Sequence, residues 1–430
     1  MTENARDPFA PPPLPADLRE RAEAAGWPAE LIEKAQALRV PRRFFEWWVT
    51  HGDFGLERAQ WGIRHWDRLT FGHLRGRDAT LLDNDRFAEL WDNAPERIGD
   101  WEITVERRPN AFAQFVLQDN VSIPVIEDNG LLVACVVWAH VNVIVGGQRL
   151  AVHCGQGLRV HQAFRGEGYG NVVRAVGRPV SFRPTDGQFH YVRSQNYAAI
   201  DFFKHTTPSV VAGSPEREGD VPGISVTVQQ YPRRPHKRGG TGIRLAQRSD
   251  VRRCVSLTNR THRGYDLFRP RSEQELELRL DSGYWGERPA GWAPVYGWDD
   301  FWVVEDGGRI VACGGLWDRG RDIRERWRNH WTNEERTVSY TALLDFGFER
   351  GREDAMARLI EHFIGEADRL GRDFLIAPLE QFPRVAALLE HCAPVPETRA
   401  LGWLRWGPDG EDIVPPQPAI ARPFTDLSYW

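Results

Sequence analysis

The hydrophobic pattern at the start of the chain is helical. Apolar residues recur at helical spacing between Leu18 and Ala35, and Gly26-Trp27-Pro28 interrupts the run. Because Gly ends helices and Pro is common where they begin, this pattern predicts two short helices. We therefore expect residues 15–77 to form a small helical region, preceded by a flexible, Pro-rich arm over residues 1–14.

From residue 78 the pattern changes to one typical of β-strands. A short helix is expected at Arg86–Trp91, and strands are predicted at Trp101–Arg107, Phe112–Gln118, Ile123–Ile126, Arg149–Val160 and Phe189–Arg193. The run from Ile126 to Val145 predicts a hairpin that turns at Glu127-Asp128-Asn129-Gly130. The fold class is therefore α/β (α+β), with a mixed sheet flanked by helices.

The strand-rich part contains an internal repeat. VIEDNGLLVAC, from Val125 to Cys135, matches VVEDGGRIVAC, from Val303 to Cys313, without a gap. The period is too long for a solenoid and indicates two copies of one domain. We expect copies at 78–232 and 243–408, joined by a basic, Gly-rich linker at 233–242 and followed by a tail at 409–430.

Composition and charge exclude several classes of protein. The net charge of −5 gives no overall basic field for nucleic acid or an anionic membrane. The longest apolar run is too short to span a bilayer, and the start of the chain does not resemble a signal peptide. The five cysteines are widely spaced, which fits a reducing, cytoplasmic setting and argues against a metal site. Only three of the 55 basic residues are lysines, which indicates a GC-rich bacterial gene.

A glycine-rich turn carries the candidate chemistry. The strand that ends at Val160 leads into Arg165-Gly166-Glu167-Gly168-Tyr169-Gly170, and a helix is expected to begin at Asn171. A strand, a glycine turn and a helix start form a cradle for phosphates, because free N–H groups and the helix dipole face the turn. Arg165 adds a charge-assisted donor. The turn lacks the GK[ST] ending of a P-loop.

The turn and a later segment together resemble the GNAT superfamily of acyl-CoA N-acyltransferases. Arg165, Gly168 and Gly170 match the R/Q-x-x-G-x-G/A loop of that family, which grips the coenzyme A pyrophosphate. Asn196, after the strand at Phe189–Arg193, matches the family's second motif. With the repeat, the resemblance implies two tandem GNAT-like domains, similar in layout to mycothiol synthase.

The resemblance also implies a binding mode. Each domain would have a splayed central sheet, and the acyl-pantetheine would lie in the gap like an added strand. Acetyl-CoA or another acyl-CoA would be held by Val160, the turn from Arg165 to Gly170, Asn171 and Asn196. A small-molecule amine would attack the thioester, and a backbone N–H on a bulged strand would hold the oxyanion.

The proton-transfer groups depart from the family pattern. The usual tyrosine acid is replaced by Phe203, which cannot donate a proton, although a thiolate is a weak enough base to leave unaided. The candidate base is His153, whose unperturbed pKa of about 6.5 suits the role. A histidine held by hydrogen bonds within the strand explains His153 equally well.

The second copy and the N-terminal region leave alternatives open. In the second copy Arg352-Glu353-Asp354 replaces the glycine run, so we expect its fold to persist without a coenzyme grip. A helix is expected there from Ala355 to Leu370. The missing tyrosine also allows a GNAT-like decarboxylase, or a transferase that works with an acyl carrier protein docked on residues 15–75. A non-catalytic acyl-CoA-binding scaffold is a third alternative, and the sequence leaves the oligomeric state open.

Overall fold

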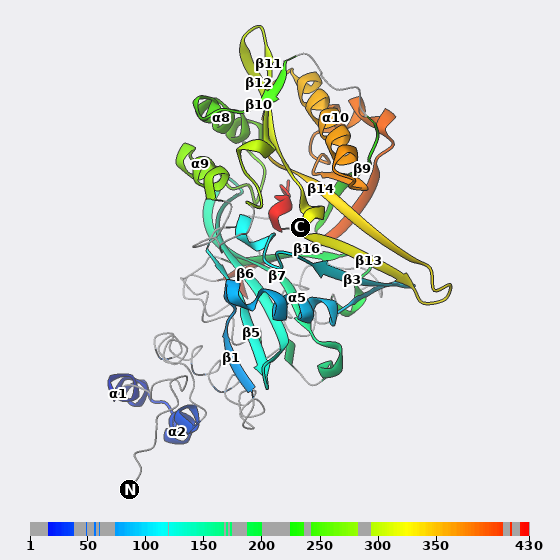
Figure 1. Ribbon diagram of the computed structural model, residues 1–430. Coiled ribbons are helices and arrows are strands. Elements are labelled where there is room, and N and C mark those ends of the chain that lie inside the picture. Colours follow the sequence, from blue (N-terminus) through cyan, green and yellow to red (C-terminus); the bar gives the residue numbers. More distant parts are fainter. Residues whose placement is uncertain are drawn as a thin grey trace.

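A computed structural model gives the fold of the chain. It describes residues 16–37, 49, 56, 60, 74–118, 120–166, 169–170, 173, 187–199, 224–235, 242–282, 294–406, 413–414 and 422–429. Two strand-rich halves stack on each other, and helices α1 and α2 lie at the N-terminal end of the molecule (Figure 1). No helix among the described residues is long and apolar enough to cross a membrane.

The N-terminal half contains the following elements. The helices are α1 (Ala16–Ala24), α2 (Ala29–Ala37) and α5 (Asn84–Asp92), with 3-10 turns η1 (Leu81–Asp83), η2 (Phe115–Leu117) and η3 (Gln162–Phe164). The strands are β1 (Leu74–Asp78), β2 (Glu96–Ile98), β3 (Trp101–Arg107), β4 (Val121–Ser122), β5 (Pro124–Asp128), β6 (Leu131–Val145), β7 (Gln148–Val160), β8 (Gly187–Arg193) and β9 (Ile224–Pro232).

The C-terminal half repeats this plan. Its helices are α8 (Val251–Thr261), α9 (Glu273–Ser282), α10 (Glu353–Arg369) and α11 (Pro383–Leu388), with 3-10 turns η5 (Arg248–Asp250), η6 (Trp298–Asp300), η7 (Arg319–Arg321), η8 (Glu390–Cys392) and η9 (Leu427–Tyr429). Its strands are β10 (Ile243–Leu245), β11 (Phe301–Asp306), β12 (Arg309–Trp317), β13 (Ile323–Asn329), β14 (Glu335–Phe348), β15 (Phe374–Ala377), β16 (Val395–Trp406) and β17 (Ile413–Val414).

The two halves share one continuous sheet and exchange a strand. The order across the sheet is β1-β5-β6-β7-β8-β16-β9-β15-β14-β12-β11-β10. Only β7–β8 and β14–β15 are parallel pairs in this run of described strands. Strand β9 of the first half lies beside β15, whereas β16 of the second half lies beside β8. Each half therefore completes the sheet of the other.

Local sequence explains the repeated hairpins. Asn129 and Gly130 have φ values of 48° and 88°, and Gly307 and Gly308 have values of 57° and 75°. Positive φ at both central residues is typical of the two-residue turn that suits twisted strands. The hairpin predicted around Glu127–Gly130 is thus confirmed as β5–β6, and β11–β12 is its copy.

A partly buried ion cluster is also duplicated. In each half an arginine on the first strand binds an aspartate at the start of the following helix and a glutamate in the hairpin. The clusters are Arg77 with Asp83 and Glu127, and Arg244 with Asp250 and Glu305. Because the same side chains make the same contacts twice, the sequence repeat is a repeat of three-dimensional structure.

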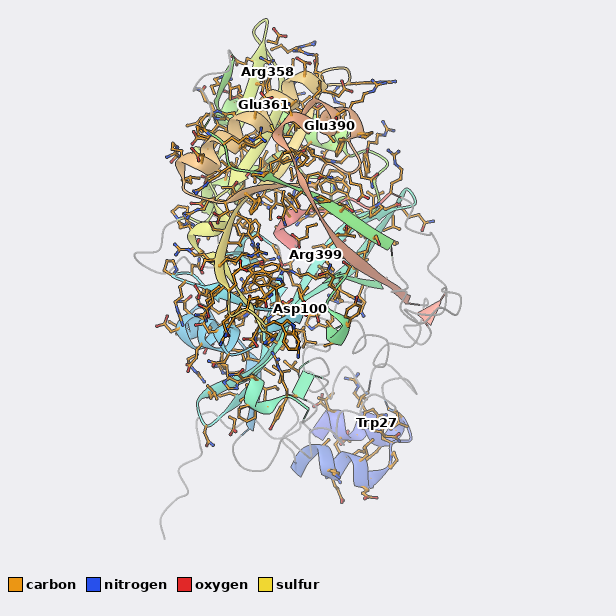
Figure 2. All side chains as sticks on the ribbon, turned by 90° about the vertical axis from the view of Figure 1, so that its right-hand side faces the viewer. Trp27, Asp100, Arg358, Glu361, Glu390 and Arg399 are labelled. Atoms are coloured by element: carbon orange, nitrogen blue, oxygen red, sulfur yellow. The ribbon has the colours of Figure 1, made fainter. Side chains whose placement is uncertain are left out.

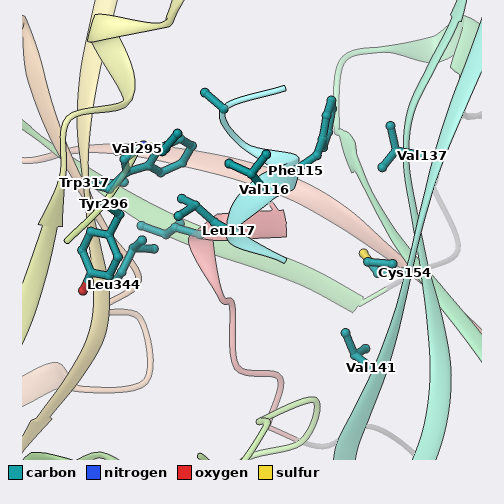
Figure 3. Packing of buried hydrophobic residues seen from close by; sticks show 14 of the residues in the cluster. Phe115, Val116, Leu117, Val137, Val141, Cys154, Val295, Tyr296, Trp317 and Leu344 are labelled. Atoms are coloured by element: carbon teal, nitrogen blue, oxygen red, sulfur yellow. The ribbon is translucent and has the colours of Figure 1, made fainter. Parts of the chain in front are cut away.

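One predicted strand is wrong. Residues 112–118 form a turn and the 3-10 helix η2 rather than a strand. Phe112, Phe115 and Val116 are buried at helical spacing, and η2 lies between the two halves. Figure 3 shows Phe115 and Leu117 between the β6–β7 sheet on one side and the C-terminal half on the other. Burial of the side chains from two sides favours a helical turn, because a strand placed between the two halves would present a face to each of them but would have no neighbouring strand to pair with.

Other predicted elements agree with the structure. The strands predicted at Trp101–Arg107, Arg149–Val160 and Phe189–Arg193 correspond to β3, β7 and β8. The helix predicted at Ala355–Leu370 corresponds to α10. Helices α8 and α10 pack on the sheet of the C-terminal half from its two sides (Figure 1).

Candidate functional site

The site lies where two parallel strands separate. Strands β7 and β8 pair only from Val152 with Gly187 to Gly155 with His190, although β7 continues to Val160 and β8 to Arg193. A cavity of about 640 Å³ occupies the gap beyond the last pair. It is large enough for a small-molecule ligand. Beyond the last pair, the backbone N–H and C=O groups of β7 on this side form no ladder with β8, so they can bond to a ligand that lies along the strand.

Strand β7 carries a β-bulge beside the cavity. Cys135 of β6 pairs with Arg159 and Val137 pairs with Gln156, so β7 has one residue more than β6 over this stretch. Gly157, inside the bulge, has a φ of +60°. A Cβ atom there would lie 3.1 Å from Cζ2 of Trp91 and 3.3 Å from a methyl of Val137. Glycine is therefore required by both the backbone angle and the packing.

Positive charge gathers in the cavity of a chain that is acidic overall. The acidic residues that line it are two glutamates, Glu96 and Glu325. The basic residues that line it are more numerous: Arg97, Arg107, Arg159, Arg165, Arg193, Arg319 and Arg399. The last two and Glu325 come from the C-terminal half. In Figure 2, Arg399 lies near the middle of the molecule, between the two halves. Such a lining attracts an anionic ligand.

Glu96 connects the two sides of the gap. Its carboxylate forms an ion pair with Arg159 of β7 and accepts a hydrogen bond of 3.3 Å from Nδ2 of Asn196, which follows β8. Burial opposes ionisation of Glu96, but the charges of Arg159, Arg193 and Arg399 outweigh it and lower the pKa. The carboxylate therefore stays ionised and fixes the width of the gap. Sequence reasoning missed Glu96 because it lies in a short, polar strand.

The two motifs found in the sequence meet at this cavity. Val160, Arg165, Gly166, Tyr169, Gly170 and Asn196 all line it. Arg165 donates to the backbone oxygens of Val160 and Pro95, so two of its N–H groups hold the turn itself. Oδ1 of Asn196 accepts from the N–H of Ala199 at 3.1 Å, which caps the short helix that follows. Glu167, Gly168, Asn171 and Phe203 lie outside the described residues.

His153 is placed beside the cavity wall rather than among the lining residues. It is 3% exposed, and its ring lies 5.3 Å from that of His140 and 6.1 Å from that of Trp138. Its neighbour Cys154 packs into the central core with Phe189, so His153 faces the other side of β7. The role of His153 as a base stays a prediction.

The corresponding gap in the C-terminal half is filled. Strands β14 and β15 pair from Tyr340 to Ala342, and β14 then carries the same bulge, with Asp345 at a φ of +47° where β7 has Gly157. Among the described residues, the space there is about 20 Å³ and is lined by residues 424–427. Asp345 forms ion pairs with Arg271 and Arg279. A pantetheine arm does not fit this space.

One group in the described residues could offer three metal ligands. Glu361, His391 and Cys392 place a ligand atom each within 4.8 Å of one another. Nε2 of His391 lies 3.1 Å from the Glu361 carboxylate, which is an ordinary ion-pair distance when the ring is protonated. None of the three residues lines the cavity.

Comparisons with solved structures identify the architecture. The chain is similar to N-myristoyltransferase from Saccharomyces cerevisiae with bound myristoyl-CoA, at a TM-score of 0.54 and 12% identity over 79% of this chain and 82% of that one. A second structure of the yeast enzyme, with myristoyl-CoA and inhibitors, gives a TM-score of 0.52 at 11% identity, over 79% of this chain and 84% of that one. The chain has the GNAT fold.

Three further results complete the comparisons. A GCN5-related N-acetyltransferase from Sphaerobacter thermophilus matches at a TM-score of 0.46 and 16% identity, over 83% of this chain and 98% of that one. No family profile matches the sequence, and no curated protein matches it significantly. The separated strands β7 and β8 and the bulge beside them correspond to the gap expected of the GNAT fold, and the C-terminal half repeats the bulge but not the open gap.

Proposed function

We propose that the protein is an acyl-CoA-dependent N-acyltransferase that acetylates a small-molecule amine. The observation that carries the proposal is the gap between β7 and β8, which is positively lined and borders the glycine turn from Arg165 to Gly170. The second half, whose own gap is filled, would act as a structural partner. The yeast enzyme of similar fold was solved with an acyl-CoA, which supports this class of donor.

The coenzyme would lie along the unpaired part of β7. Its pantetheine amides would bond to the backbone between Gln156 and Val160, as an added strand does. Its phosphates would bind the glycine turn and the surrounding arginines. The thioester carbonyl would then reach the bulge at Gly157. Because a bulge leaves the extra residue outside the ladder, an N–H there can hold the oxyanion.

The remaining steps are proton transfers. The amine must lose a proton as it attacks the thioester carbon, and His153 is the proposed base. The C–S bond breaks as the amide forms, and the thiolate leaves as an anion that water can protonate. This route does not require an acid at Phe203.

The closed end of the gap supports a short acyl group. Trp138 lines the cavity, and its indole lies over Gly155, where a Cβ atom would approach to 2.7 Å. Gly155 and His190 form the last pair of β7 and β8. A chain entering from the bulge would meet this indole, so we propose an acetyl donor rather than a long one.

The test is calorimetric binding of acetyl-CoA and longer acyl-CoAs to the wild type and to Gly168→Glu. We expect micromolar binding by the wild type and its loss in the variant, because a carboxylate in the turn would repel the phosphates. A matched control is Gly351→Glu, in the corresponding turn of the second half, where a Cβ atom meets open space and the φ of +81° adds only local strain far from the cavity. That variant should bind like the wild type.

Turnover then separates the proposal from its alternatives. Release of coenzyme A that depends on an added amine would support the transferase. Tight binding without turnover on any amine would indicate a scaffold. Absence of binding would contradict the proposal and make a carrier-protein-linked acyl group the next donor to test.

A further inference from the structure

A buried arginine in the cavity has no acidic partner among the described residues. Arg107, the last residue of β3, is 2% exposed and lines the cavity. Its guanidinium lies 3.9 Å from the ring centroid of Trp91 and 4.6 Å from that of Phe115. It donates to Oε1 of Gln114 at 2.9 Å and to the Ala111 carbonyl at 3.4 Å, and its Nε–H has no hydrogen-bond partner in the part of the chain that the structure describes.

The charges around Arg107 are unfavourable to it. No ion pair between described residues includes Arg107, and Arg319 and Arg159 are close enough to repel it. Burial, followed by these two positive charges, lowers the pKa of Arg107 well below its usual range. Glu325 is already paired with Arg193 and lies 3.7 Å from Arg319. The negative charge of Glu325 offsets this repulsion only in part, so Arg107 is a buried cation without an ion-pair partner among the described residues, and an anion that enters the cavity would be stabilised there.

The position of Arg107 relates this anion to the reaction. Arg107 and Arg159 stack on the same indole of Trp91, at 3.9 Å and 4.2 Å. The indole also contacts the bulge, since a Cβ atom at Gly157 would lie 3.1 Å from it. Arg107 is therefore close to the proposed site of the thioester. The pantetheine arm is uncharged there, and the coenzyme phosphates would lie at the glycine turn, so the anion belongs to the acyl group or to the acceptor.

We propose that Arg107, with Arg319 beside it, binds a carboxylate of the substrate next to the thioester, so that the substrate class is an amino carboxylate or a dicarboxylic acyl group. The proposal rests on the transferase function. A planar guanidinium with free N–H donors suits a carboxylate, which accepts two parallel hydrogen bonds. Arg319 comes from η7 of the C-terminal half, so the second half would help to select the substrate.

The experiment compares substrates that differ only in this charge. One arm measures kcat/KM with acetyl-CoA for amino acids and for the corresponding amino-acid amides. The other arm compares acetyl-CoA with succinyl-CoA, using an uncharged amine. We expect a preference for the carboxylate of about 100-fold in one arm, which identifies its source, and loss of that preference in Arg107→Met. Arg107→Lys should keep part of it, because the charge remains.

A binding measurement removes the dependence on turnover. N-acetyl amino acids or free succinate should raise the melting temperature of the wild type and leave that of Arg107→Met unchanged. The variant should still bind acetyl-CoA, which distinguishes failure of this inference from failure of the transferase function. Arg326→Met is the control, because Arg326 lies on β13 with a half-exposed side chain and does not line the cavity. Equal rates on charged and uncharged substrates in both arms, or an undiminished preference in Arg107→Met, would overturn the proposal.

Discussion

Substitution of Gly157 by alanine tests whether the bulge supports catalysis. At a φ of +60° an alanine is strained by about 1–2 kcal/mol. Its Cβ atom would also lie 3.1 Å from Trp91 and 3.3 Å from Val137, and overpacking of this kind costs about 1–3 kcal/mol. We therefore expect Gly157→Ala to lower the free energy of unfolding by about 2–5 kcal/mol.

The same change should lower the rate far more than binding. Movement of the bulge by a few tenths of an ångström would misplace the N–H that is proposed to hold the oxyanion, and loss of one such donor costs about 100- to 1,000-fold in kcat. Affinity for acetyl-CoA should change little, because the phosphates bind at the glycine turn. The assay is coenzyme A release at saturating substrate, with the folded fraction checked by circular dichroism.

Gly147→Ala is the matched control for Gly157→Ala. Gly147 lies at the turn of the same β6–β7 hairpin and has a φ of +79°, and no described atom beyond its two chain neighbours lies within 4 Å of the position that an alanine methyl would take. It should lose about 1–2 kcal/mol of stability and keep its kcat. If Gly157→Ala, once folded, turned over as fast as Gly147→Ala, the bulge would not be the oxyanion site.

Three further predictions follow from packing, charge and strand exchange. Trp138→Ala removes the indole over Gly155 and should shift kcat/KM toward longer acyl-CoAs by about tenfold. An unchanged chain-length profile would refute the proposal that Trp138 limits the length of the acyl chain. Burial lowers the pKa of His262 to about 3, so the unfolded state takes up a proton below pH 6.5 that the folded state does not. Stability measured by urea unfolding should thus fall by about 1.4 kcal/mol per pH unit below pH 6.5, and less steeply in His262→Gln. Residues 74–235 alone lack β16 and should remain protease-sensitive, and co-expression with residues 242–430 should restore a folded complex.

The sequence predicted features that depend on local backbone and pattern. The Asn129-Gly130 turn and strand β7 follow from turn-forming residues and from the strand pattern, which are properties of neighbouring residues. The strand-exchange arrangement did not follow. Strand β9 pairs with β15 and β16 pairs with β8, and nothing local to either strand selects its partner.

Buried charges were the main features missed. Arg107 follows Ile103 and Val105 at a spacing of two, so the alternation of β3 placed it on the buried face. The sequence therefore indicated that Arg107 is buried. It could not show that Arg107 has no paired carboxylate among the described residues, because only the tertiary structure reveals that. Glu96 gave no such signal, because its partners Arg159 and Asn196 are distant in sequence.

The second half has lost its own cavity and contributes to that of the first. Strand β16 pairs over seven residues with β8 and over seven with β9, so removing it would expose two strand edges. Strand β13 pairs with β3 along its length and carries Glu325 at the cavity wall, and η7, just before it, carries Arg319 there. Because Asp345 and residues 424–427 fill the second gap, that half needs no ligand to complete its core. The first half therefore has the open gap, and the second half supplies part of its wall and the strand that pairs with both β8 and β9.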